Sequence, residues 1–259
     1  MTDDEIIARA DANYFESWRA IVTAVDGGEA RQTGGVLVTN SGMPLPWFNI
    51  GFITRPLADP ARAVDQIAHY FDGLRLPFII RVREGVDPAA ERACEAAGMP
   101  YSDTVPGMVL SELPAAVTMP DGLEVRAAAD AQTLQHHVDV IAAAFGMPLA
   151  FAQQLLSPRL LGVPDLALYV GYVDGEAVAT AALVASHRVA GVYNVACLPS
   201  HRKRGYGEAM TWHAVHAGAA IGCTMASLQA SEMGRPVYER MGFRLVAPYR
   251  TFVRPEHRG

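Results

Sequence analysis

The chain has 259 residues, of which 51% are apolar and 19% are charged, enough for one large globular domain or two small ones. Its net charge of −6 excludes the molecule-wide positive field that nucleic-acid binding uses, so no nucleic-acid partner is expected. The three cysteines are widely spaced and form no CxxC pair, which argues against a disulfide framework and against a zinc site.

The N-terminus indicates a cytoplasmic protein. Residues 1–5 are acidic and lead into a polar helix, whereas a signal peptide is basic and then apolar. No uninterrupted apolar run reaches the length of a membrane span. We therefore expect a cytoplasmic chain that makes no contact with a membrane, and the sequence leaves a homodimer open.

The first half is predicted to mix helices and strands. Apolar residues recur at helical spacing over 3–25, and alternating or apolar runs bounded by turn residues predict the strands. The expected elements after the first helix are strands over 36–39 and 48–54, a helix over 60–71, a strand over 78–82 and a helix over 88–97 that ends at Gly98. Val109 and Leu110 are predicted to begin the exit from this half. Residues 113–122 contain two prolines and a glycine, which indicates a linker after a domain over 1–112.

The second half, predicted as a domain over 123–259, begins a new pattern. We expect a strand over 123–126, a helix from Asp130 to about Phe145, and a short helix over 151–156. A hairpin turn at Asp174-Gly175 joins strands over 166–173 and 177–186. The remaining elements are a strand over 192–198, a helix over 207–220, a strand over 225–229, a helix over 236–241, and one or two strands over 243–253. This order predicts an α/β (α+β) fold with a mixed sheet.

A basic loop with two glycines lies between the strand over 192–198 and the helix that follows it. Pro199 cannot continue a strand ladder, so the chain must turn there. Gly205 and Gly207 let the backbone approach a ligand closely. The free amides of Arg204 to Glu208 then lie at a helix N-terminus, where the helix dipole favours an anion such as a pyrophosphate.

This loop resembles the signature R/Q-x-x-G-x-G/A of the GNAT (GCN5-related) N-acetyltransferase family, with Pro199, Arg202, Gly205 and Gly207 in register. The resemblance implies acetyl-CoA as cosubstrate, with its pyrophosphate on the loop amides and its pantetheine arm along the preceding strand. It also implies a bulge near Asn194 that splays this strand from its neighbour. The cofactor-binding residues predicted on this basis are Val195, Ala196, Cys197, Arg202, Lys203, Arg204, Gly205, Tyr206, Gly207 and Glu208.

A second match lies downstream, where Val237 to Phe243 resembles the family's terminal motif Y-x-x-x-G-F. The resemblance implies that Tyr238 lies near the CoA sulfur and protonates the leaving thiolate, so Tyr238 is the predicted catalytic residue. The alternative is a core tyrosine on a short helix that Gly242 caps. Ser231 stands where many members have asparagine, and it is carried as a further cofactor-binding residue.

The first half resembles a degenerate copy of the second. Ala93 to Met99 lines up with Val237 to Phe243, with Cys94 in place of the tyrosine and Gly98 matching Gly242. Nothing in residues 1–112 resembles R-x-x-G-x-G. The chain is therefore similar to tandem GNAT proteins in which one half is inactive and shapes the acceptor site; chance similarity is the alternative.

The resemblance implies an N-acetyltransferase that moves the acetyl group of acetyl-CoA to a primary amine of a small molecule or peptide by direct attack, without a metal. A non-catalytic acyl-CoA-binding regulatory module is the main alternative and a purely structural domain a third, and Tyr238 favours the enzyme. The general base is left open among Glu124, Glu176, His187 and a water chain.

Three further residues are not expected to carry chemistry. His213 and His216 share a helix face but lack a third metal ligand. Cys197 is interpreted as a small buried side chain rather than as a nucleophile.

Overall fold

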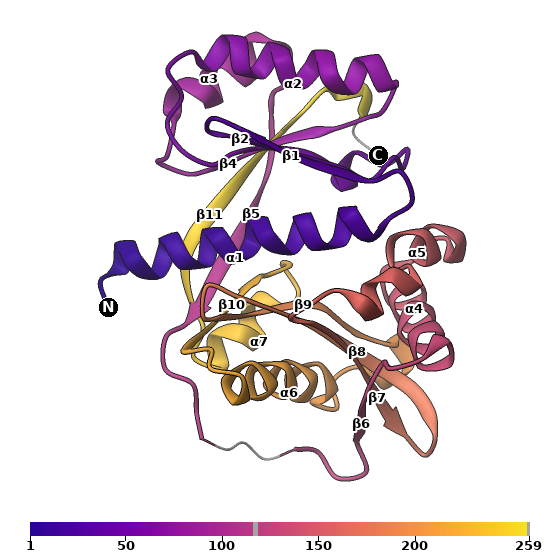
Figure 1. The fold of residues 1–259 in the computed structure, drawn as a ribbon. Helices are drawn as coiled ribbons and strands as arrows, with labels where there is room; N and C mark the ends of the chain where they lie inside the picture. Colours follow the sequence, from indigo (N-terminus) through magenta and orange to yellow (C-terminus); the bar gives the residue numbers. More distant parts are fainter. Residues whose placement is uncertain (116–118, 258–259) are drawn as a thin grey trace.

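One mixed sheet runs through both halves of the protein (Figure 1). The computed structural model describes residues 1–115 and 119–257. The sheet that these residues form has eleven strands in the order β1-β2-β3-β4-β11-β5-β10-β9-β8-β7-β6. The strands are β1 Glu29–Thr33, β2 Val36–Asn40, β3 Asn49–Ile53, β4 Ile79–Arg83, β5 Tyr101–Leu110, β6 Glu124–Ala127, β7 Leu166–Val173, β8 Glu176–Ser186, β9 Val189–Cys197, β10 Met225–Gln229 and β11 Arg244–Val253.

Helices cover both faces of this sheet. The helices α2 and α3 pack on one face of the first half, and the long helix α1 packs on the other. In the second half α6 and α7 cover one face, while α4 and α5 cover the other. The α-helices are α1 Asp3–Ala24, α2 Pro60–Leu74, α3 Pro88–Ala96, α4 Ala131–Phe145, α5 Leu149–Leu155, α6 Tyr206–Ala220 and α7 Arg235–Arg240, and short 3₁₀ turns occupy Pro46–Phe48, Pro158–Gly162, Pro199–His201 and Pro255–His257.

The two halves repeat one succession of elements. The series β1, β2, β3, α2, β4, α3, β5 corresponds to β7, β8, β9, α6, β10, α7, β11, and in each series the third and fourth strands are parallel. The ends of α3 and α7 match in detail. The amide of Met99 donates to the carbonyl of Cys94 and that of Phe243 to Tyr238, both at 2.9 Å, and Gly98 and Gly242 both have positive φ. The aligned motifs therefore occupy equivalent places in the two halves.

Each half completes the sheet of the other. Strand β11, from the second half, lies between β4 and β5 of the first half and is antiparallel to both. Strand β5 in turn lies between β11 and β10. The described residues of the predicted linker, 113–115 and 119–122, form neither helix nor strand, and the predicted domain boundaries on either side of it stay predictions.

The helix α1 joins the halves through one buried side chain. The Asn13 amide donates hydrogen bonds to the carbonyls of Val184 and Val189, and its oxygen accepts one from the hydroxyl of Tyr193 at 2.7 Å. Gly191 lies directly beneath, where a Cβ would approach the Asn13 oxygen to 2.0 Å. A helix from the first half is therefore tied to strands β8 and β9 of the second.

The predicted elements are confirmed apart from the two strands at the start and end of the first half. β1, with the sequence Glu-Ala-Arg-Gln-Thr, was not predicted, because a polar strand at the sheet edge lacks an apolar alternation. The prediction that Val109 and Leu110 begin the exit from this half is wrong. They are the last residues of β5. This strand was not predicted because Pro106 and Gly107, which are uncommon inside strands, interrupt its pattern.

Candidate active site

A bulge in β9 opens the sheet beside β10. Asn194 has φ 51°, and the pairing of β8 with β9 shifts register there, from Ala182↔Tyr193 to Thr180↔Ala196. Strand β9 pairs with β10 only as far as Gly191. The bulge near Asn194 that the resemblance implied is therefore present, and the two strands diverge beyond it.

The loop after β9 presents backbone amides to this opening. The helix α6 begins at Tyr206, its N-cap is Gly205 in the left-handed region at φ 82°, and no described side chain caps it. The first intrahelical bond is that from Ala209 to the Gly205 carbonyl, so the amides before it lack helical partners. A Cβ on Gly207 would meet only Val195, at 3.9 Å across the cleft. An anion can therefore approach this helix end closely.

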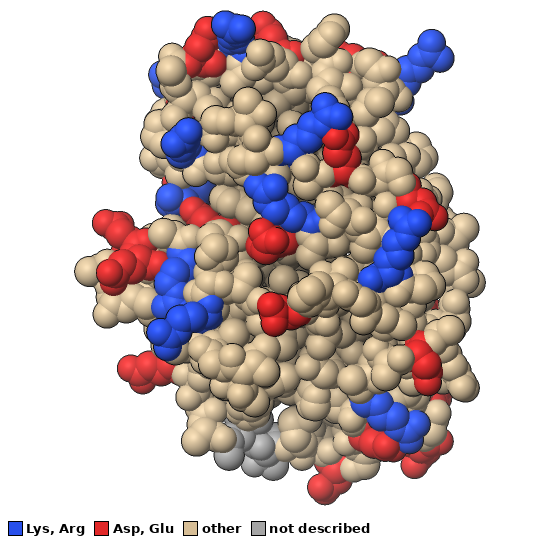
Figure 2. Space-filling view, viewed as in Figure 1, with Lys and Arg blue, Asp and Glu red and all other residues tan. Residues whose placement is uncertain are grey.

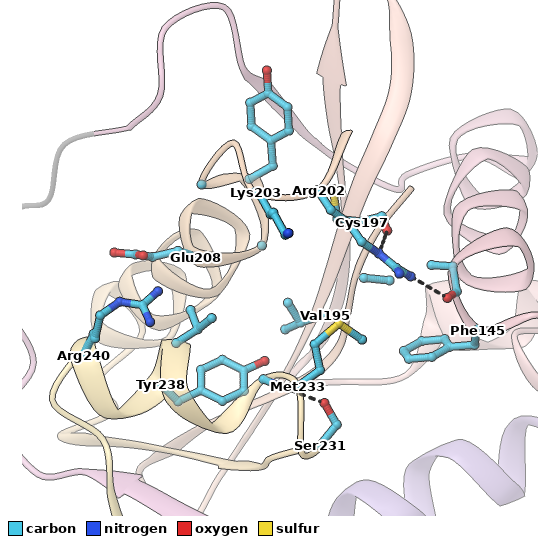
Figure 3. A pocket seen from close by; sticks show the side chains of 17 residues that line it. Phe145, Val195, Cys197, Arg202, Lys203, Glu208, Ser231, Met233, Tyr238 and Arg240 are labelled. Carbon is cyan, nitrogen blue, oxygen red and sulfur yellow. Dashed lines mark hydrogen bonds between the residues drawn. The ribbon is translucent and has the colours of Figure 1, made fainter. Parts of the chain in front are cut away.

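Two cations of the loop, Arg202 and Lys203, have different surroundings. The guanidinium of Arg202 donates to the carbonyl of Ala144 at 3.0 Å and so ties the loop to the last turn of α4. Lys203, the single lysine of the chain, extends from the loop into the cleft (Figure 3). Arg202 thus fixes the loop in place, whereas the ammonium of Lys203 can face a phosphate.

The opening forms a cleft of about 610 Å³ (Figure 3). All the predicted site residues line it except Arg204. Sequence reasoning missed two groups of lining residues. Ala144, Phe145, Met233 and Gly234 lie outside both motifs, and Val237 and Arg240 lie in the terminal motif at positions that carried no predicted role. The spacing of the two motifs is therefore enough to find most of this cleft.

Tyr238 points from α7 into the cleft toward Val195 (Figure 3). Burial raises the pKa of its phenol to about 12, against a smaller lowering by a hydrogen bond with Thr211. The phenol is therefore protonated at neutral pH. Ser231 lines the same cleft. Its hydroxyl accepts a hydrogen bond from the amide of Gly234 at 3.1 Å, which stabilises the turn before α7.

The three side chains left open as general base lie outside the cleft. Glu124 is exposed and ion-paired with Arg126, Glu176 begins β8 beside the hairpin turn, and His187 lies in the turn between β8 and β9. Cys197 does line the cleft, where burial raises the pKa of its thiol and makes a thiolate less accessible.

A second cavity, of about 330 Å³, lies beside the cleft, bounded by α1, α4, α5 and the opposite face of the sheet. Phe145, Val195, Ser231 and Tyr238 line both spaces, so the two meet at the diverging strands. Most of its other walls were not predicted as site residues. They include Tyr14, Ser17, Trp18, Arg81, Tyr193 and Gln229.

The signal that could have revealed this second cavity is Arg81, a charged residue inside the apolar run Phe78-Ile79-Ile80-Arg81-Val82. A charge at the centre of a buried strand needs a partner or a function.

The first half lacks the equivalent anion site. Its corresponding helix, α2, is capped by Asp59, whose carboxylate accepts the amide of Arg62 at 3.0 Å. Pro60 removes a further N–H from the first turn. The parallel strands β3 and β4 stay paired from Ile50↔Ile79 to Ile53↔Val82, without a bulge. A fixed carboxylate therefore occupies the place where the second half offers free amides.

Comparison with known proteins identifies the second half. Residues 140–243 match the model of the acetyltransferase (GNAT) family. A GCN5-related N-acetyltransferase from Kribbella flavida is similar over 96% of this chain and 95% of its own, with 19% identity and a TM-score of 0.74. A GCN5-related N-acetyltransferase from Sphaerobacter thermophilus is similar over 85% of this chain and 78% of its own, with 17% identity and a TM-score of 0.65. A tandem GNAT protein from the clavulanic acid biosynthesis pathway covers 94% of each chain, with 12% identity and a TM-score of 0.61.

The C-terminal half therefore contains a GNAT acetyltransferase domain, and the whole chain has the GNAT fold in an arrangement that resembles a tandem GNAT protein. No curated protein sequence matches the chain. Among residues 1–115 and 119–257, no group of three or more His, Cys, Asp or Glu side chains could hold a metal ion. No helix in the described part of the chain has the length and apolar character to cross a membrane.

Proposed function

We propose that the protein transfers the acetyl group of acetyl-CoA to the primary amine of a small molecule, at one site per chain. The observation that carries this is the continuity of the two spaces. The cleft with the amide loop meets the second cavity at Val195 and Tyr238, where the strands diverge. A cofactor and an acceptor can therefore enter from opposite sides of the sheet and meet between β9 and β10.

The cofactor contacts follow from the cleft. The pyrophosphate would lie on the amides at the start of α6 beside Lys203, and the pantetheine arm along the β9 edge from Val195 to Cys197, whose pairing with β10 has ended. Backbone amides of that edge would polarise the thioester carbonyl. Of the two equivalent helices, α6 offers free amides and α2 does not, which supports a stoichiometry of one.

In the reaction, the neutral amine nitrogen attacks the acetyl carbon, the carbon–sulfur bond breaks, the nitrogen loses a proton and the sulfur gains one. Tyr238 holds a proton at neutral pH and faces the cleft, so we assign it the donation to the departing sulfur. The proton lost from nitrogen leaves through water, because Glu124, Glu176 and His187 lie outside both spaces.

The size of the second cavity supports a small acceptor. About 330 Å³ lies at the lower end of the range for ligand pockets. Positive and negative side chains also alternate over the face seen in Figure 2, which supports a small molecule over a polyanionic partner such as nucleic acid.

Calorimetric titration with acetyl-CoA tests the cofactor site. We expect one molecule per chain, and no binding in Gly207→Glu, because the new side chain enters the cleft toward Val195 and its charge repels phosphate. Gly73→Glu is the matched control, since Gly73 is also a helical glycine with open space above it. Two equivalent sites, or full affinity in a folded Gly207→Glu variant, would contradict the assignment.

The single lysine gives an independent measure of the same site. An amine-reactive ester can modify only Lys203 and the N-terminal amine. Acetyl-CoA should protect Lys203 and leave the N-terminus reactive, as peptide mass spectrometry would show. Equal labelling of Lys203 with and without acetyl-CoA would remove it from the phosphate site.

A further inference from the structure

The second cavity contains a buried positive charge without a carboxylate partner. Arg81 is only 7% exposed and lines this cavity from β4. Its Nη1 donates to the phenol of Tyr14 at 2.5 Å, while its Nε has no partner among the described residues. A guanidinium stays charged in proteins, and burying one without a counter-ion is costly.

The carboxylate of Asp11, one helical turn before Tyr14 on α1, is already engaged. Asp11 accepts from Arg83 at 2.8 Å and from the phenol of Tyr249 at 2.5 Å. No ion pair links Arg81 to any carboxylate in the described part of the chain. By contrast Arg250, on the neighbouring strand β11, is paired with Glu91, and Arg254 with Asp72. Arg81 thus differs from the other arginines of its sheet in lacking an acid.

The remaining walls of the cavity are mostly apolar or aromatic. They come from Trp18 and Ile21 of α1, from Phe48, and from Leu155 and Leu156. The polar side chains Ser17, Asn194, Gln229 and Ser231 are uncharged, and Arg81 is the one charged side chain among the lining residues, so its charge dominates the chemistry of one end. The other end reaches Tyr238 and Val195, where the acetyl group would be transferred.

The strand order gives a lower limit to the separation between these ends, because Val195 lies on β9, one strand beyond Gln229 of β10. Arg81 is on β4 and Gln229 on β10, with β11 and β5 between them. Three strand spacings amount to roughly 14 Å, of which the arginine side chain itself spans a part. A ligand that meets both ends therefore needs a body between its two polar groups.

We propose that Arg81 binds the carboxylate of the acceptor, and that the acceptor is an amino acid of the ω type, in which an apolar or aromatic spacer separates the primary amine from the carboxylate. This inference rests on the proposed acetyl transfer for the role of the amine end. The guanidinium fork suits a carboxylate because it can donate two parallel hydrogen bonds to it.

The test uses two ω-amino acids, ε-aminocaproate and p-(aminomethyl)benzoate, each compared with its own carboxamide. Binding to the full chain is measured by calorimetry without acetyl-CoA, and acetylation is then measured with it. Each acid should bind at least about 30-fold more tightly than its carboxamide, because only the acid neutralises the buried cation. Arg81→Met should abolish that difference, Arg81→Lys should retain part of it, and Arg250→Met should leave it intact.

The outcomes separate this inference from the proposed function. Acids and amides that bind equally, a preference that survives in Arg81→Met, or no binding of either acid would overturn the carboxylate site even if acetyl-CoA binds and other amines are acetylated. Carboxylate binding that depends on Arg81, in a chain that does not bind acetyl-CoA, would instead uphold this site and refute the transfer. Thermal unfolding of each variant confirms that the comparison is between folded proteins.

Discussion

The phenol of Tyr238 is a weaker acid in this fold than in water, because burial disfavours its charged form and raises its pKa to about 12. A thiol has a pKa near 8.5 in reference peptides, so full transfer of the phenolic proton to a thiolate is uphill. The hydrogen bond that Tyr238 donates to the sulfur therefore matters most, and the water that takes the proton of the amine can in turn restore the phenol. We therefore expect the contribution of Tyr238 to kcat to lie toward the lower end of the range for general acid catalysis.

Replacing Tyr238 with phenylalanine keeps the ring and removes only the hydroxyl. General acid catalysis is typically worth about 10²–10⁴-fold, and we expect a loss of kcat of about 10²-fold with little change in affinity for acetyl-CoA. The measurement is steady-state turnover on an identified amine. A core tyrosine without catalytic function would instead leave kcat unchanged and shift stability by about 1 kcal/mol at most.

His137 should make stability depend on pH. Its ring is fully buried, its Nδ1 donates to the carbonyl of Tyr169 at 3.1 Å, and desolvation lowers its pKa from 6.5 to about 4. Between pH 6.5 and 4 the unfolded chain binds more protons at this residue than the folded chain does. The neutral ring therefore contributes its full stability above pH 6.5. About 3 kcal/mol of this stability is lost as the pH falls toward 4.

Urea unfolding at a series of pH values tests this contribution. His137→Gln keeps a donor for the Tyr169 carbonyl and cannot ionise, so it should show a shallower loss of stability between pH 6.5 and 4 than the wild type. The neighbouring His136 reaches the hydroxyl of Tyr172 instead, and His136→Gln is the matched control. Parallel pH profiles for wild type and His137→Gln would refute the assignment.

At the scale of elements, local pattern predicted most of the sheet but not its order. The strands over 166–173 and 225–229 were predicted to the residue, because apolar runs and turn residues bound them clearly. The polar edge strand β1 and the interrupted strand β5 carry no such pattern. Strand order depends on contacts between residues far apart in the chain, which a single sequence does not encode locally.

The candidate site also has a part that the sequence predicted and a part that it did not. The amide loop and Tyr238 belong to two short motifs with fixed spacing, so the sequence located them. Much of the second cavity comes from α1, β4, β5, α4 and α5, which carry no motif, and only its junction with the cleft, at Val195, Ser231 and Tyr238, was predicted. Most of its other walls are apolar or uncharged polar side chains that no sequence pattern marks, and only the fold brings them to Arg81.

The attachment of α1 can be tested at Asn13. This side chain is fully buried and hydrogen-bonded to β8 and β9. Asn13→Ala should destabilise the protein by about 2–4 kcal/mol, because several buried polar groups lose their partner at once. Glu16→Ala, on an exposed side of the same helix, should change stability by about 0.5 kcal/mol or less. Denaturant unfolding measures both, and equal effects would show that Asn13 does not anchor the helix.

At the scale of the whole molecule, the two halves should stay associated after the backbone between them is cleaved. Because β11 is paired with β4 and β5, and β5 with β10, the halves share the centre of one sheet. A protease recognition sequence inserted into 113–122 and cleaved in the folded protein should give two fragments that elute together in gel filtration. Residues 1–112 expressed alone should fail to unfold cooperatively. Separation of the fragments in native buffer would contradict the shared sheet.

The exchange of β5 and β11 also has a consequence for biosynthesis. Domains of a multidomain chain generally fold as units, the N-terminal one first, while synthesis continues. Here the place between β4 and β5 is filled by residues 244–253. The first half therefore cannot close its sheet until the ribosome has made nearly the whole chain, and during that time the edges of β4 and β5 are unpaired. Such edges pair readily with other chains. For this protein, protection by chaperones during translation should matter more than for a chain whose two domains fold in turn.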